Sequence, residues 1–167
     1  KQVQLSVSIA AGYGKRCGLK TQKMFRDLMT LFGEDKVWQS LDVYRPKATN
    51  IEEKLPVIVS VHGGGWVYGD KKPISLLLEF AQRGFAVVNF FYRLAPESKF
   101  PASIIDTNLV FGWILDHAEE YGLDSENIFA VGDSAGAICL VCIQIYVRTR
   151  NMQKLMKINW NPDTAGS

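Results

Sequence analysis

The chain of 167 residues contains few cysteines and few histidines. Its three cysteines, Cys17, Cys139 and Cys142, argue against a small secreted scaffold held by disulfides and fit a reducing compartment. We therefore expect a cytoplasmic protein. Its two histidines, His62 and His117, do not lie at ligand spacing from the cysteines, so a metal site is not expected. No cofactor is expected either.

The sequence also lacks a strong charge of one sign and a long hydrophobic run. A net charge of +2 gives no reason to expect a nucleic-acid partner, since such proteins carry a concentrated basic face. The longest uncharged run, residues 134–147, is shorter than the roughly 18 residues that span a bilayer. Residues 3–9 alternate apolar and polar side chains, which predicts a strand and not a signal peptide. We expect no membrane span.

Short β-branched runs alternate with segments of helical spacing along the chain. The predicted strands are residues 38–44, 57–61, 85–90 and 128–131. The predicted helices are residues 21–32, 74–82, 101–121 and 135–147. Buried strands that alternate with helices form βαβ units, so the pattern predicts an α/β fold, a three-layer sandwich around a mostly parallel sheet.

The strongest motif is Gly132-Asp133-Ser134-Ala135-Gly136. It matches G-x-S-x-G and lies between a predicted buried strand and a predicted helix. A serine in such a tight turn exposes its hydroxyl group, and small neighbours avoid collisions. The N-terminus of the following helix also favours negative charge beside it. This context indicates a nucleophilic serine.

A second motif, His62-Gly63-Gly64-Gly65-Trp66, follows the predicted strand 57–61. Consecutive glycines allow backbone N–H groups to turn into a cavity and hold an oxyanion. Loss of one such donor typically costs about 3–4 kcal/mol of transition-state stabilisation. A phosphate-binding loop is the alternative, but the lysine and Ser/Thr of a P-loop and the G-x-G-x-x-G spacing are missing.

A third motif, Tyr-Arg-Leu-Ala-Pro-Glu at residues 92–97, lies between these two. With the three motifs in this order, the sequence resembles the α/β-hydrolases, specifically the hormone-sensitive-lipase-like esterases, over residues 38–147. The resemblance implies a partial α/β-hydrolase domain at residues 38–150, incomplete at its C-terminal end. Residues 1–37 would be an N-terminal segment and candidate cap fragment, and residues 151–167 a polar tail.

The resemblance also implies roles for individual residues. Ser134 would be the nucleophile, and Trp66 and Tyr68 would line the mouth of the substrate pocket. The oxyanion hole would use the backbone N–H groups of Gly64, Gly65 and Ala135. The residues expected to support the glycine loop are His62, Gly63 and Glu97.

The triad of this superfamily follows the order serine, acid, histidine. The residues after Ser134 contain one acid, Asp163, and no histidine. His62 is expected to shape the glycine loop, and His117 to lie on the surface. The general base is therefore missing, which leaves the serine hydroxyl protonated and weakly nucleophilic. The acids expected in bracing, capping or surface roles, instead of the triad, are Asp70, Glu97, Asp106 and Asp133.

These observations favour the N-terminal part of a serine carboxylic-ester hydrolase that acts on small esters through an acyl-enzyme. As this chain, it is expected to be weakly active or inactive. The alternative is a non-catalytic ligand-binding or interaction module on a hydrolase scaffold. A third hypothesis is that a second copy completes the site, since a strand 128–131 at the sheet edge and the apolar helix 135–147 would favour self-association.

Overall fold

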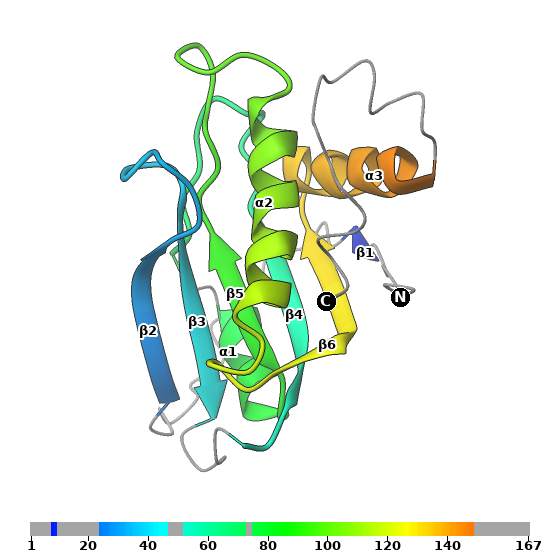
Figure 1. The fold of residues 1–167 in the computed structure, drawn as a ribbon. Coiled ribbons are helices and arrows are strands. Elements are labelled where there is room, and N and C mark those ends of the chain that lie inside the picture. Colours follow the sequence, from blue (N-terminus) through cyan, green and yellow to red (C-terminus); the bar gives the residue numbers. More distant parts are fainter. Residues whose placement is uncertain (1–7, 10–23, 47–51, 73–74, 149–167) are drawn as a thin grey trace.

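A computed structural model gives the structure of residues 8–9, 24–46, 52–72 and 75–148. Their strands form one six-stranded sheet of order β1-β6-β4-β5-β3-β2 (Figure 1). The strands that run parallel to one another are β1 (Ser8–Ile9), β6 (Leu123–Gly132), β4 (Leu55–Val61) and β5 (Ala86–Phe90). The antiparallel strands at the other edge are β3 (Ser40–Pro46) and β2 (Met24–Leu31).

Three helices cover the two faces of this sheet. Helix α1 (Ser75–Gln82) connects β4 to β5, α2 (Ala102–Asp116) connects β5 to β6, and α3 (Ala135–Arg148) follows β6. Helices α2 and α3 contribute to the core on one face, and α1 packs on the other. The predicted three-layer α/β architecture is therefore confirmed. None of the helices in the described ranges has the length and apolarity that a membrane crossing needs.

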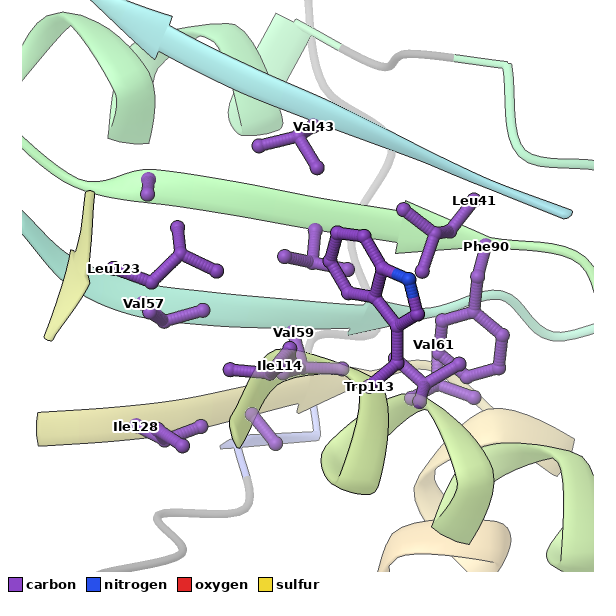
Figure 2. Close-up of a cluster of buried hydrophobic side chains, with 14 of the residues drawn as sticks. Leu41, Val43, Val57, Val59, Val61, Phe90, Trp113, Ile114, Leu123 and Ile128 are labelled. Carbon is purple, nitrogen blue, oxygen red and sulfur yellow. The ribbon is translucent and has the colours of Figure 1, made fainter. Parts of the chain in front are cut away.

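The core is built from the alternation of side chains along the central strands. Val57, Val59 and Val61 of β4 face α2, where they meet Trp113 and Ile114 (Figure 2). The intervening Ile58 belongs to the cluster on the α1 side. Burial on both faces explains why β4 consists almost entirely of apolar residues.

The strands predicted at residues 57–61 and 85–90 and the helices predicted at 74–82 and 135–147 are confirmed, with small shifts of their ends; the strand predicted at 128–131 is confirmed as β6, which begins earlier, at Leu123. The strand predicted at 38–44 is β3, which begins at Ser40. The helix predicted to reach residue 121 ends earlier, at Asp116. Turns continue the chain to Gly122, where φ is +57° and a left-handed conformation suits glycine.

The helix predicted for residues 21–32 is wrong. Residues 24–31 form β2, which pairs antiparallel with β3 and so extends the sheet. The pairing is irregular between Asp27 and Thr30, where Met29 has a φ of +65°. A short apolar run fits either periodicity, and here the hydrogen bonds to β3 decide the outcome.

The sequence predicts the strand 128–131 at the edge of the sheet, and this prediction is wrong for the end of β6. The two-residue strand β1 pairs with it at Val131 and Gly132. Over residues 123–130, β4 is the only neighbour of β6 among the described strands. Helix α3 exposes the apolar side chains of Ile138, Val141 and Ile145. Self-association through this region stays a prediction, and the predicted polar tail 151–167 lies outside the described residues.

Candidate active site

Ser134 lies in a tight turn between β6 and α3. Its side chain is exposed and its φ is +47°, a strained backbone conformation for a residue with a Cβ atom. The turn is tight because Gly136 lies against β4: a Cβ atom there would lie 2.2 Å from the carbonyl oxygen of Val61. A Cβ atom on Gly132 would lie 2.8 Å from the backbone of Gly136. The two motif glycines thus permit the turn that exposes the serine.

The glycine loop after β4 lies next to this turn. The backbone N–H of Gly63 donates a hydrogen bond of 2.8 Å to Asp133 Oδ1, so the residue before the serine fixes the start of the loop. Gly64 and Gly65 have φ values of +115° and +59°. In the described part of the chain, their N–H groups donate to no acceptor, and Ala135, as the first residue of α3, has an N–H outside the helical hydrogen bonds.

His62 is part of the framework of this loop. Its ring stacks on Tyr92 at a centroid distance of 4.2 Å, and its Nδ1 lies 2.7 Å from the carbonyl oxygen of Gly63. The hydroxyl of Tyr92 donates to the backbone oxygen of His62 at 2.8 Å. Burial lowers the pKa of His62 and raises the pKa of Tyr92, so a neutral imidazole and a protonated phenol are favoured here.

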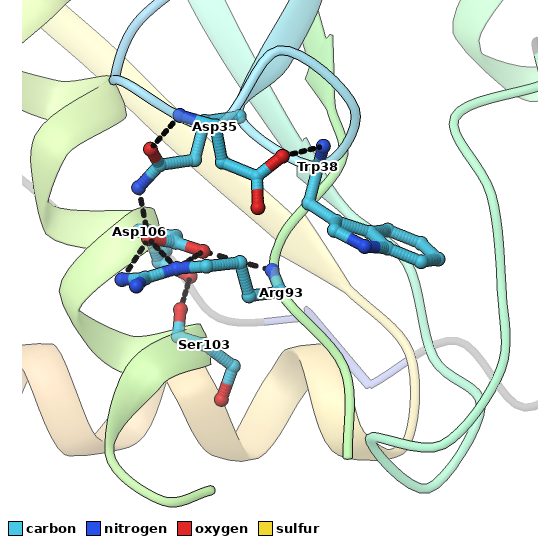
Figure 3. A network of polar contacts seen from close by, with 7 residues as sticks. Asp35, Trp38, Arg93, Ser103 and Asp106 are labelled. Carbon is cyan, nitrogen blue, oxygen red and sulfur yellow. Dashed lines mark hydrogen bonds and ion pairs between the residues drawn. The ribbon is translucent and has the colours of Figure 1, made fainter. Parts of the chain in front are cut away.

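An ion pair holds the 92–97 segment against α2. Asp106 of α2 is fully buried and accepts hydrogen bonds from the side chain of Arg93, at 2.7 Å from Nη2, and from its backbone N–H at 2.8 Å (Figure 3). Gln39 Nε2 donates to the same carboxylate at 2.7 Å. Asp106 is therefore occupied with bracing, as the sequence predicted.

A second buried ion pair lies in the segment that follows the glycine loop. Lys71 Nζ lies 2.5 Å from Asp42 Oδ1, and both side chains are less than a tenth exposed. The hydroxyl of Tyr44 and the backbone N–H of Met29 also donate to Asp42. The sequence analysis did not identify this pair, because neither residue belongs to a recognised motif.

Neither histidine of the chain forms a hydrogen bond with Ser134. His117 lies at the other end of β6, where it stacks on Trp113 at 4.6 Å and its Nδ1 lies 2.9 Å from the carbonyl oxygen of that residue. Within the described ranges, the hydroxyl of Ser134 has no hydrogen-bond partner. That the general base is missing stays a prediction. Glu97 is exposed, and its support of the loop stays a prediction.

The two aromatic residues expected to line the pocket behave differently. Tyr68 is 69% exposed, whereas Trp66 packs against the core. The indole N–H of Trp66 donates to the sulfur of Cys139 at 3.4 Å. This contact joins residues far apart in the sequence, and the analysis of motifs gave no signal for it.

The family comparison settles the relationship of this chain to known proteins. The BD-FAE family model matches residues 41–161, which include the glycine loop and the serine turn. The chain belongs to the BD-FAE family. The fold and the relatives of this BD-FAE chain confirm the expected membership in the α/β-hydrolases.

Several curated and solved relatives of this BD-FAE chain are named esterases. It is 37% identical over 130 residues to an esterase of Gibberella moniliformis, a match that covers 75% of this chain and 41% of that protein. It is 34% identical over 126 residues to carboxylesterase NlhH of Mycobacterium tuberculosis, covering 73% and 39%. Esterase B of Lactobacillus rhamnosis, in a phosphonate-inhibited form, superposes with a TM-score of 0.69 at 27% identity, covering 81% and 44%. The matched region thus spans less than half the length of each relative.

Proposed function

We propose that this chain carries the nucleophile and oxyanion hole of a serine carboxylic-ester hydrolase that acts on small esters. One observation carries the proposal: Asp133, directly before the exposed Ser134, bonds the N–H of Gly63. This bond ties the loop with its free N–H groups to the turn that presents the hydroxyl. A reacting carbonyl would then meet a nucleophile and oxyanion donors together.

In the proposed reaction, Oγ of Ser134 forms a bond to the carbonyl carbon of the ester. The π electrons of the carbonyl move to its oxygen, and the N–H groups of Gly64, Gly65 and Ala135 stabilise the resulting oxyanion. The hydroxyl proton passes to a base. The oxyanion then reforms the carbonyl and expels the alkoxide, which leaves an acyl-serine for hydrolysis by water.

The proton acceptor determines how active these 167 residues are. A histidine normally takes the proton in this reaction, and neither His62 nor His117 forms a hydrogen bond with Ser134. In this chain the acceptor is hydroxide or a base in the buffer. We therefore expect weak activity, which comes from the oxyanion hole and from substrate binding.

An O-alkyl p-nitrophenyl phosphonate tests both parts of the proposal. Oγ of Ser134 bonds to phosphorus and p-nitrophenolate leaves, so the mass of the intact protein reports the reaction. We expect labelling that Ser134→Ala abolishes and whose rate rises about tenfold per pH unit between about pH 7 and 9, since hydroxide is the base. Added imidazole should raise the rate by about tenfold or more, because a free imidazole supplies the missing group.

Two results separate the alternatives. A rate that levels off near neutral pH, without any effect of imidazole, would show that a group of this chain already acts as the base. Reversible binding of small esters without any labelling of Ser134 would favour the alternative function, a non-catalytic ligand-binding module on a hydrolase scaffold.

A further inference from the structure

We propose that Trp66 is a positioning residue for the oxyanion hole: its indole N–H, bonded to the sulfur of Cys139, fixes the glycine loop to the helix that follows Ser134. This inference rests on the proposed esterase function. It concerns how the two donors of the loop, Gly64 and Gly65, are held at the distance that catalysis needs.

The backbone of Trp66 indicates that the surroundings hold it in place. Its φ of +62° lies in the left-handed region, which a bulky side chain rarely adopts. Two hydrogen bonds fix this conformation. The indole N–H donates to Cys139 Sγ at 3.4 Å, and the backbone oxygen of Trp66 accepts from the N–H of Ala95 at 2.8 Å. The ring itself packs against the main core.

Cys139 is a rigid anchor for this contact. It is fully buried on α3, little more than one helical turn after Ser134. Its thiol donates a hydrogen bond of 3.8 Å to the hydroxyl oxygen of Ser103 on α2. The indole of Trp66 thus joins the glycine loop to α3 and, through Cys139, to α2.

The two oxyanion donors lie between two ties. Asp133 holds Gly63 before them, and Cys139 holds Trp66 after them. Both anchors, Asp133 and Cys139, lie on the polypeptide that flanks Ser134. Oxyanion donors work at about 2.7–3.1 Å from the developing charge, so a small displacement of the loop weakens the transition state more than the ground state.

The test uses the phosphonate reaction with paired variants of the whole chain. Trp66→Phe keeps the ring and removes the N–H group. We expect the maximal labelling rate of Ser134 to fall about tenfold, while the half-saturating phosphonate concentration stays the same. Cys139→Ala should have the same effect. The double variant should be no slower than either single variant, since each substitution removes the same hydrogen bond. Cys139→Ser, whose hydroxyl oxygen accepts a hydrogen bond, should restore most of the rate.

Trp38→Phe is the matched control. Trp38 also packs partly buried against the main core, where it contacts Phe91, and it forms no hydrogen bond or ring contact with residues 62–66. We expect its labelling rate to equal that of the wild type. The indole N–H signals of the four tryptophans in ¹H–¹⁵N NMR spectra provide a second readout. The signal that Trp66→Phe removes should be protected from hydrogen exchange and should shift in Cys139→Ala.

The outcomes separate this inference from the proposed function. Labelling of the wild type at Ser134 with an equal rate in Trp66→Phe overturns the positioning role and leaves the esterase proposal standing. A wild type that is not labelled at Ser134 overturns the esterase proposal, and the positioning role with it. An unprotected Trp66 indole signal overturns the hydrogen bond to Cys139 in either case.

Discussion

Replacing Arg93 by alanine should destabilise the fold strongly, because it removes the cation that faces the buried carboxylate of Asp106. The side chain of Asp106 is 0% exposed, whereas that of Arg93 is 28% exposed. Arg93 supplies contacts from Nη2 at 2.7 Å and from Nε at 3.0 Å. The variant keeps two donors to the carboxylate, the backbone N–H of residue 93 and the amide of Gln39.

The loss of stability in Arg93→Ala depends on the hydrogen-bond donors that remain around Asp106. Loss of one partner of a buried ion pair costs about 3–5 kcal/mol, since it leaves a buried charge without its counterion. The two remaining donors and the partial exposure of the Arg93 side chain place the expected loss at the lower end, about 3 kcal/mol. With a urea dependence of about 2 kcal/mol per molar, this corresponds to a fall of about 1.5 M in the unfolding midpoint.

Urea unfolding followed by far-ultraviolet circular dichroism measures this change. Arg83→Ala is the matched control, because Arg83 forms an exposed pair with Glu79 at 4.0 Å and its side chain is 73% exposed. It should lose only about 0.3 kcal/mol, or roughly 0.15 M in midpoint. A loss below about 1 kcal/mol for Arg93→Ala would refute the reasoning that the ion pair keeps Asp106 stable in the core.

Two further predictions concern the glycine loop and the segment that follows it. Lys71→Met should lower the unfolding free energy by about 3 kcal/mol, since Asp42 stays buried without its cation. Lys72→Met, at the exposed neighbour, should leave the urea midpoint unchanged. Equal urea midpoints for the two variants would contradict a stabilising buried pair. Burial lowers the pKa of His62 below 6.5, so the unfolded state binds more protons and stability should fall as the pH drops below about 6.5, by at most about 1.4 kcal/mol per unit. Between pH 7.5 and 5, the urea midpoint should fall less for His62→Asn than for the wild type. An identical dependence of the midpoint on pH in the two proteins would exclude a contribution of His62 to the pH dependence of stability.

Local patterns in the sequence were sufficient for the centre of the fold. Strand β4 is a β-branched run that ends at glycines, and the serine motif lies directly between an apolar run and a helix. Period, length and turn residues agree there, which makes the prediction robust. Residues 24–31 lack this agreement, because their apolar spacing suits a helix as well as a strand. The pairing with β3 decided their conformation, and nothing local encodes that partner.

The contacts that fix the glycine loop could not be predicted either, because they join residues far apart in the sequence. Trp66 meets Cys139 across 73 positions, and Lys71 meets Asp42 across 29. Neither pair has a spacing rule, since helical or strand periodicity relates only residues close in sequence. The place of Trp66 after a glycine loop predicts a pocket residue, and this prediction stays untested; the hydrogen bond of its indole N–H to Cys139 has no signal in the sequence. The motif located the loop, and only the tertiary structure identified its anchors.

The geometry separates two contributions to catalysis that usually occur together. Strands β4 and β6 are parallel neighbours with Val61 opposite Gly132, so the glycine loop and the serine turn leave the same edge of the sheet side by side. Gly136 then allows α3 to start against the backbone of β4. In the proposed reaction, these elements supply the oxyanion donors, whereas proton transfer needs a base such as an imidazole. Under this proposal, the rate of Ser134 labelling without imidazole reports what the oxyanion hole and substrate binding contribute with hydroxide as the base, and the increase with imidazole reports what a better base adds.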